Sequence, residues 1–420
     1  MNPPATDRAA PPGWILALVI ALFFAWGFAT VLIDTLVPKL KALFDLTYAE
    51  VMLTQFSFFI AYLVVSIPAG LLLSRIGYVR AIVVGLLVMA LGCVLFAPAA
   101  MVGLYPGFLL ALFIIAAGIT VLQVAANPLM ALLGPSATSH SRLNLAQAFN
   151  SLGTTLGPLL GAALILSTGL VTPNAAVLSP EALTALRRSQ AHVLQVPFLG
   201  IAAGLLLLAV LFWSLRQRIV LPHAGAAATL PGTLALLRDA RVALGMLSIF
   251  LYVGAEVSVG SVMTNYLIWP HTLGLAAQRA GEIVSLYWGG AMLGRFVGAA
   301  ALRHVRPGQL LCGCAAVAAC LAVTSALSAG LLAAVTIVAI GLCNAIMFPT
   351  IFTLTIEGEI GDTPQASALL CMAIVGGAVV PVVSGAAADH FGLSAALLAP
   401  AACYLWITFY GGMAASRRAG

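Results

Sequence analysis

The sequence predicts an all-α membrane protein in which twelve transmembrane helices form two pseudo-symmetric halves of six helices each. Of its 420 residues, 62% are apolar and only 7% are charged, whereas charged residues make up about 25% of an average soluble domain. The chain has too few polar groups to cover a surface that faces water. Its apolar residues instead form runs of the ~20 residues that a spanning helix needs.

Glycine, proline and charged residues separate these runs and give the boundaries of the expected helices. In the first half, we expect helices over 14–37, 48–73, 80–99, 105–132, 143–166 and 193–215. In the second half, we expect them over 242–268, 281–302, 308–328, 331–354, 366–386 and 394–414. The polar segment 216–241 therefore divides the chain into an N-terminal bundle (1–215) and a C-terminal bundle (242–420).

The basic residues predict the orientation of the chain in the membrane. If the N-terminus is cytoplasmic, twelve Lys and Arg residues fall in the inside connections and tails, and five fall in the outside ones. Cytoplasmic connections carry an excess of basic residues, so we expect both termini and the linker 216–241 to be cytoplasmic. The net charge of +6 is thus a topology signal, and we expect no nucleic-acid partner.

Corresponding positions of the two halves carry similar residues. Gln123 stands five residues before Pro128 in the fourth expected helix, and Asn344 stands five residues before Pro349 in the tenth. Near-constant offsets between halves with an even number of spans indicate a parallel repeat, which places a binding site between the halves at mid-membrane depth.

Two carboxylates lie within expected helices and are our candidates for cation coupling. Asp34 stands near the outer end of the first helix, and Glu256 stands in the middle of the seventh. An ionised side chain at such depth costs about 2.5–3.5 kcal/mol on insertion scales, so these groups favour taking up a proton or a cation. The alternatives are that Asp34 caps a helix end near Lys39 and Lys41, and that a protonated Glu256 bonds to a neighbouring helix.

Four amides in the fourth and fifth helices are the main candidates for substrate binding: Gln123, Asn127, Gln147 and Asn150. Within each helix the pair shares one face, at spacings of i, i+4 and i, i+3. Carboxamides both donate and accept hydrogen bonds, which suits the neighbouring hydroxyls of a sugar. Asn344 joins them as the repeat counterpart of Gln123. The alternative is that these amides bond helices to one another.

Three further residues complete the expected substrate site. Trp26 and Trp288 are aromatics at the depth of the site, where a flat ring can stack on the C–H face of a pyranose, although core packing is an equal alternative. Asn265 lies further out on the seventh helix and can also be read as a helix-end amide. Asn127 precedes Pro128 and can alternatively satisfy a backbone group that the proline frees.

Arg295, within the eighth expected helix, is the candidate for a gating residue. A buried guanidinium needs partners, and we expect one of three acids in the inside loop of the second half to pair with it: Glu357, Glu359 or Asp362. Such a pair would latch the cytoplasmic gate. No glycine-rich loop ending in Lys-Ser/Thr indicates a nucleotide site, and no nucleophile–base or metal-ligand pattern indicates an enzyme. The seven cysteines support neither a disulfide framework nor a zinc site.

Several segments resemble the fucose–proton symporter family of the major facilitator superfamily, and most of all its glucose/galactose porter branch. They are RLNLAQAFNSLGTTLGP (142–158), QVAANP (123–128), YWGGAMLGRFVG (287–298), MFPTIFTLTIEG (347–358) and LLCMAIVGGAVVP (369–381). The resemblance extends over nearly the whole chain, and the match at 142–158 is highly specific.

The resemblance implies a V-shaped transporter that takes up hexoses with a cation by alternating access. In fucose symporters, an Asp in the first helix and a Glu in the fourth form the titrating pair. Asp34 matches the first of these, but Gln123 stands where the Glu would be, so the proton relay cannot be transferred intact. The loop signature between the second and third helices also departs from the family pattern, with Ser74 in place of an acidic residue.

These observations predict a secondary transporter that takes up a hexose such as glucose or galactose together with a proton or sodium ion. We expect no cofactor beyond the co-transported ion, a monomer, and a location in a bacterial inner (cytoplasmic) membrane. The rival hypotheses are an uncoupled sugar facilitator or exporter, and a membrane sugar sensor that does not transport.

The role assigned to Asp34 is testable by neutralising it. We expect Asp34→Asn to abolish uphill uptake and to spare sugar exchange, because an amide cannot carry the coupling proton. Uptake and exchange of labelled sugar in proteoliposomes separate the two activities. Unchanged accumulation against a gradient would contradict the role.

Overall fold

The computed structural model describes residues 12–34, 48–102, 105–166, 180–219, 228–357 and 363–417, and the regular structure in these ranges is helical. The spans of the N-terminal half are α1 (Gly13–Asp34), α3 (Tyr48–Ile76), α4 (Tyr78–Val102), α5 (Tyr105–Leu132), α6 (Ser139–Leu166) and α7 (Pro180–Leu215). Those of the C-terminal half are α9 (Ala240–Ile268), α10 (Ala277–Ala301), α11 (Pro307–Leu327), α12 (Gly330–Asn344) with α13 (Met347–Ile356), α14 (Thr363–Met372) with α15 (Gly376–Phe391), and α16 (Leu398–Arg417).

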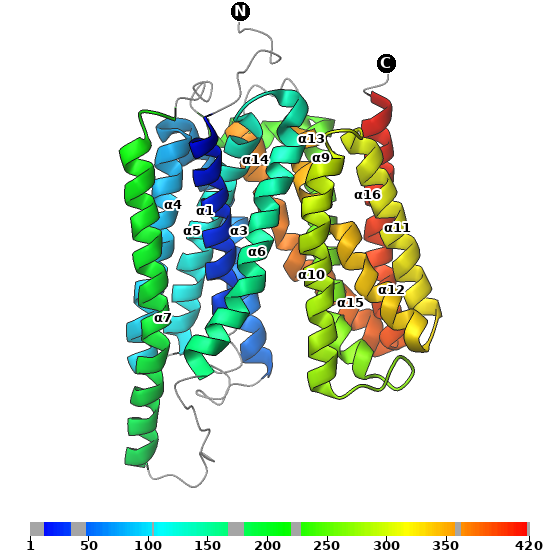
Figure 1. Ribbon diagram of the computed structural model, residues 1–420, viewed down its shortest axis with the longest axis horizontal. Coiled ribbons are helices and arrows are strands. Elements are labelled where there is room, and N and C mark those ends of the chain that lie inside the picture. Colours follow the sequence, from blue (N-terminus) through cyan, green and yellow to red (C-terminus); the bar gives the residue numbers. More distant parts are fainter. Residues whose placement is uncertain are drawn as a thin grey trace, which may run out of the picture.

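The expected twelve-span architecture is confirmed. Ten of the spans in the described ranges are apolar and long enough to cross a bilayer, and α6 and α10 complete the twelve. Figure 1 shows the spans running roughly alongside one another, with the start of α1 and the end of α16 at the same end of the bundle. We call this end the termini end. α7 begins at Pro180 rather than 193, because hydropathy does not detect the polar first turns of a helix.

The two halves meet along two seams that are related by the repeat. α6 packs against α10 along one seam, and α3 packs against α14 along the other. The first seam joins the fifth span to the eighth, and the second joins the eleventh to the second, so exchanging the halves converts one seam into the other. This arrangement is the pseudo-symmetry that the sequence repeat predicts.

Both seams are closely packed at their glycines. A methyl group on Gly298 of α10 would collide with Ile346 and with the Asn144 amide of α6, and one on Gly70 of α3 would collide with Ala368 of α14. Small residues let helices approach closely within a membrane, and the two halves are in close contact at these positions.

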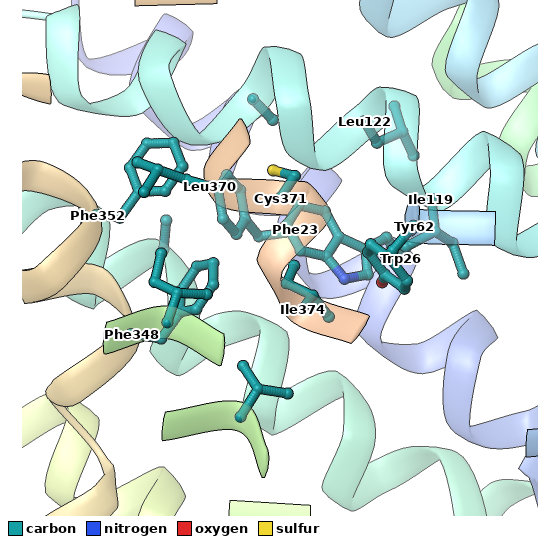
Figure 2. Packing of buried hydrophobic residues seen from close by; sticks show 14 of the residues in the cluster. Phe23, Trp26, Tyr62, Ile119, Leu122, Phe348, Phe352, Leu370, Cys371 and Ile374 are labelled. Carbon is teal, nitrogen blue, oxygen red and sulfur yellow. The ribbon is translucent and has the colours of Figure 1, made fainter. Parts of the chain in front are cut away.

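Aromatic and aliphatic side chains fill the space between the halves beside the second seam. Figure 2 shows Trp26 of α1 and Tyr62 of α3 next to Cys371 of α14 and Ile374 of η5 (Ala373–Val375), and all four are buried. The core of the molecule thus includes residues of both halves.

The tenth and eleventh spans are interrupted. α12 ends at Asn344 and α13 begins at Met347, while the 3₁₀ turn η5 separates α14 from α15. Discontinuous helices are the usual way in which transporters direct free backbone carbonyls and helix ends toward a central site. In the N-terminal half, the corresponding α5 and α6 are continuous.

The described part of the linker contacts both halves at the termini end. It contains a short helix, α8 (Leu230–Ala235), capped by the Thr229 hydroxyl, and α8 packs against both α3 and α14. Just before it, the Ala228 amide donates to the Ser74 hydroxyl oxygen at 3.1 Å. Ser74, noted for its departure from the family loop pattern, therefore anchors the linker.

The contact between α1 and α6 supplies a test of the packing. A methyl group on Gly153 of α6 would collide with the Phe24 carbonyl oxygen and the Phe28 amide nitrogen of α1, which are backbone atoms. We expect Gly153→Ala to destabilise the protein by about 1–3 kcal/mol, because overpacking forces the helices apart. The thermal unfolding midpoint in detergent measures the effect. Gly204→Ala on α7, which has open space around it, is the control; equal midpoints for both variants would contradict the packing.

Candidate functional site

Three of the four amides predicted for substrate binding lie where α5 faces α3 and α6. The Gln123 side-chain amide donates to the Tyr62 hydroxyl at 2.8 Å, and the Gln147 amide donates to the Asn127 side-chain oxygen at 3.2 Å. Gln123, Asn127 and Gln147 are all buried. Each therefore has a protein partner, and those partners are hydroxyl or amide groups that a sugar hydroxyl can replace.

This amide cluster adjoins the C-terminal half. The Ser367 hydroxyl of α14 donates to the Val124 carbonyl of α5 at 2.8 Å, and the Asn127 side chain lies beside the Cys371 thiol. The amides are thus placed at a junction between halves, where a change in the relative position of α14 would reach them.

Asn150 binds a neighbouring helix. Its side-chain amide donates to the Phe23 carbonyl of α1 at 2.9 Å, and a methyl group on Gly27 of α1 would collide with it. This contact is the alternative role that the sequence left open for the amides, a hydrogen bond from one helix to another. Its remaining acceptor, the side-chain oxygen, is the atom left for a substrate.

Asn344 lies in a buried hydroxyl network of the C-terminal half. Its side-chain amide donates to the Tyr287 hydroxyl at 2.8 Å, and its backbone carbonyl accepts from Tyr252 at 3.1 Å. Tyr287 in turn donates to the Glu256 backbone carbonyl at 3.2 Å. The network joins α9, α10 and the end of α12, and all three of these side chains are buried. Asn344 therefore positions the elements around Glu256.

Arg295 bridges the two halves at the first seam. One terminal nitrogen of its guanidinium lies 3.8 Å from Glu256 Oε1, and both side chains are nearly buried. The Arg295 Nε donates to the Ala345 carbonyl at the break between α12 and α13. The second terminal nitrogen donates to the Ser151 hydroxyl and the Gln147 carbonyl of α6.

The partner that we expected for Arg295 was wrong. The sequence suggested Glu357, Glu359 or Asp362, but the structure pairs Arg295 with Glu256, and Glu357 contacts His140 of α6 at 2.8 Å. Glu359 and Asp362 lie outside the described residues. α9 packs against α10 and brings Glu256 to Arg295, and the residue spacing along the sequence does not contain this information.

The remaining candidates lie at the edges of this cluster. Trp26 is buried against Phe23, with ring centroids 4.5 Å apart. Trp288 is 45% exposed and packs over Gly260 of α9, on the face of α10 that carries Arg295 two turns away. Asn265 is exposed near the C-terminal end of α9, about 13 Å along the helix from Glu256, and is separate from the cluster. Asp34 is the last residue of α1, and its side chain lies outside the described residues.

Sequence reasoning missed four residues that make polar contacts in the structure. Ser151 is at i+4 from Gln147, so the amide face could have been extended to it. Tyr62 and Tyr287 were not predicted as polar contacts because tyrosine counts as an apolar residue within a spanning helix. His140 stands three residues before the predicted start of the fifth span, at 143, and therefore falls in the connection.

A twelve-span helical bundle with two repeated halves, broken helices and buried polar groups at the junction of those halves defines a secondary membrane transporter. A family model confirms this class: the Major Facilitator Superfamily model matches residues 15–358. The chain belongs to this superfamily, and it is therefore a transporter and not an enzyme.

Individual relatives are similar over almost the whole chain. A protein named glucose/galactose transporter from Brucella abortus is 46% identical over 98% of this chain and 97% of its own. The L-fucose-proton symporter of Escherichia coli is 36% identical over 94% of this chain and 91% of its own. A crystal structure of the transporter FucP in the outward conformation superposes with a TM-score of 0.88 and 33% identity, covering 95% of this chain and 98% of that one.

The buried pair of Glu256 and Arg295 makes a stability prediction. We expect Glu256→Gln to destabilise the protein by about 3–5 kcal/mol, because it leaves a nearly buried guanidinium without its counter-charge. The double variant Glu256→Gln, Arg295→Gln should recover part of that loss. Thermal unfolding in detergent measures both.

The control is the exposed pair of Arg279 and Glu282 at the start of α10, whose atoms lie 3.7 Å apart. Glu282→Gln should leave the unfolding midpoint almost unchanged, because exposed ion pairs contribute little. Equal effects of Glu256→Gln and Glu282→Gln would contradict the burial argument.

Proposed function

We propose that the chain is a cation-coupled transporter that takes up a hexose of the glucose/galactose type by alternating access. One observation carries the proposal: neutral amides and one charge-balanced pair meet at the junction of the two halves, on helices that must move for a solute to pass. Carboxamides with interchangeable hydrogen-bond partners suit an uncharged, hydroxyl-rich solute. The relatives named glucose/galactose transporter and L-fucose-proton symporter support the same solute class.

The site divides into parts with different roles in this proposal. Gln123, Asn127 and Gln147 form the sugar-binding surface of the N-terminal half, to which Asn150 contributes its free oxygen. Trp288 supplies a partly exposed aromatic ring from the C-terminal half. Asn344 acts indirectly, by holding the helices around Glu256.

Coupling is assigned to Asp34, and Glu256 takes a different part from the one expected. Glu256 Oε1 lies 3.8 Å from a terminal nitrogen of the Arg295 guanidinium, so we assign Glu256 mainly the part of counter-charge to Arg295. Arg295 is the gating residue, because its bonds to Ser151 and Gln147 of the opposite half must break when the first seam opens. The domain boundaries proposed for this mechanism are 1–215 and 242–420, joined by 216–241, with both termini in the cytoplasm.

An uncoupled sugar facilitator is the second candidate. Two observations favour it: Gln123 cannot release a proton, and Glu256 is already paired with Arg295. The facilitator and the symporter share the same sugar site and differ only in whether a gradient can drive accumulation.

Counterflow of labelled sugar in proteoliposomes tests the proposal. We expect exchange with one or more of glucose, galactose, mannose, fucose and N-acetylglucosamine, and uphill accumulation when a pH or sodium gradient is imposed. Gln147→Ala should weaken apparent sugar affinity about 2- to 12-fold, as loss of one hydrogen bond predicts, whereas Asn265→Ala should not. Exchange without accumulation under either gradient would select the facilitator, and no exchange of any sugar would refute the proposed substrate class.

A further inference from the structure

A cysteine of the C-terminal half lies against the proposed sugar-binding amides. The Ser367 hydroxyl of α14 donates to the Val124 carbonyl of α5 at 2.8 Å, and one turn further along α14 the Cys371 thiol lies beside the Asn127 side chain. Both Cys371 and Asn127 are 0% exposed. Figure 2 shows Cys371 among the side chains that fill the space between the halves. The thiol is thus a buried contact from one half to the amide surface of the other.

One polar atom of the Asn127 carboxamide has no hydrogen-bond partner among the described residues. The Asn127 Oδ1 accepts from the Gln147 amide at 3.2 Å, whereas the Asn127 Nδ2 is buried and unpaired. Buried polar groups are almost always hydrogen-bonded, so an unpaired one indicates a partner that arrives in another state of the protein. The polar side chain of the opposite half that lies beside Asn127 is the Cys371 thiol.

Either orientation of the two amides leaves one Asn127 atom against the thiol. Turning both carboxamides over keeps the hydrogen bond between Gln147 and Asn127, but places the Asn127 oxygen beside Cys371 in place of the nitrogen. A thiol is both a weak donor and a weak acceptor, so it satisfies neither atom well. A hydroxyl group in the same place would bind either atom more strongly.

Asn127 differs in this respect from the neighbouring amides. The side-chain amide of Gln123 donates to a tyrosine hydroxyl at 2.8 Å, and that of Asn150 donates to a backbone carbonyl at 2.9 Å. A sugar that binds to those two amides has to replace a hydrogen bond that already exists. At the unpaired atom of Asn127 the sugar replaces no hydrogen bond, and it removes the cost of a buried group without a partner.

We propose that Cys371 sets the sugar affinity of this transporter, because its weakly binding thiol leaves one Asn127 atom available and a sugar hydroxyl takes that place. The thiol belongs to α14 of the opposite half, so separation of α14 from α5 uncovers the Asn127 atom and breaks no strong hydrogen bond to Cys371. A sugar hydroxyl is both a donor and an acceptor, so it pairs with either atom of the carboxamide. The proposal rests on the proposed function, which places the sugar on α5 and α6.

Replacement of the thiol sulfur by oxygen tests this role. Cys371→Ser supplies a hydroxyl that pairs with Asn127 while the halves are together, whereas Cys371→Ala supplies no polar group. Exchange of labelled sugar in proteoliposomes, measured over a range of sugar concentrations, gives the apparent affinity. We expect Cys371→Ser to weaken it about 2- to 12-fold, because the sugar then has to replace one additional hydrogen bond. Cys371→Ala should leave it close to the wild-type value.

A measurement without sugar isolates the hydrogen bond itself. Cys371→Ser should unfold in detergent at a higher temperature than Cys371→Ala, and this difference should disappear when Asn127→Ala is added to both variants, because the two positions are then uncoupled. Cys93 of α4 is also 0% exposed but lies within the N-terminal half. Cys93→Ser and Cys93→Ala are therefore the control for the effect of burying a hydroxyl group.

Two results would overturn the proposal. One is an equal apparent affinity of Cys371→Ser and Cys371→Ala, and the other is a difference in unfolding midpoint between them that is no larger than that between the two Cys93 variants. Absence of exchange with every sugar would instead refute the proposed function, and the unfolding midpoints would still decide whether the thiol leaves Asn127 unpaired.

Discussion

The placement of the two halves depends most on the counter-charge and the hydrogen-bond acceptors that surround the Arg295 guanidinium inside the bundle. This permanently charged group lies between the two halves, where an unpaired charge would be prohibitive. Four groups compensate for it: the Glu256 carboxylate, the Ala345 carbonyl, and the Ser151 hydroxyl and Gln147 carbonyl of the opposite half. Because two of the four belong to the other half, the energy of Arg295 depends on how the halves are placed.

The surrounding helices supply those groups through an interrupted helix and through buried polar side chains. Both features cost free energy in a membrane unless their polar groups are hydrogen-bonded. The interruption between α12 and α13 leaves the Ala345 carbonyl free to accept from Arg295. The buried bonds from Asn344 to Tyr287 and from Tyr287 to the Glu256 backbone hold α9, α10 and α12 in the geometry that presents the carboxylate. Close packing at Gly298 then brings α10 to α6. The helix break, the buried hydroxyl groups and the glycine contact thus all help to position the groups that compensate the charge of Arg295.

Much of the fold could be predicted from the sequence, but the partners of the polar residues could not. Apolar run length is a local property, so the twelve spans could be predicted, whereas the polar first turns of α7 and the interruptions of the tenth and eleventh spans could not. Helical spacing also identified the shared face of Gln123 and Asn127. What each face meets depends on the tilt and break of distant helices, so Glu256 was not recognised as the acid for Arg295, nor His140 as the partner of Glu357. Asn265 shows the same limit, since a polar residue on an apolar helix can simply face outward.

The central claim is that a sugar binds between the halves on the amide surface of α5 and α6. A structure determined with a bound hexose tests it most directly. We predict that the sugar hydroxyls replace Tyr62 and Asn127 as partners of the Gln123 and Gln147 amides, with Arg295 still paired to Glu256. A sugar bound elsewhere, with the Gln123–Tyr62 and Gln147–Asn127 hydrogen bonds intact, would contradict the claim.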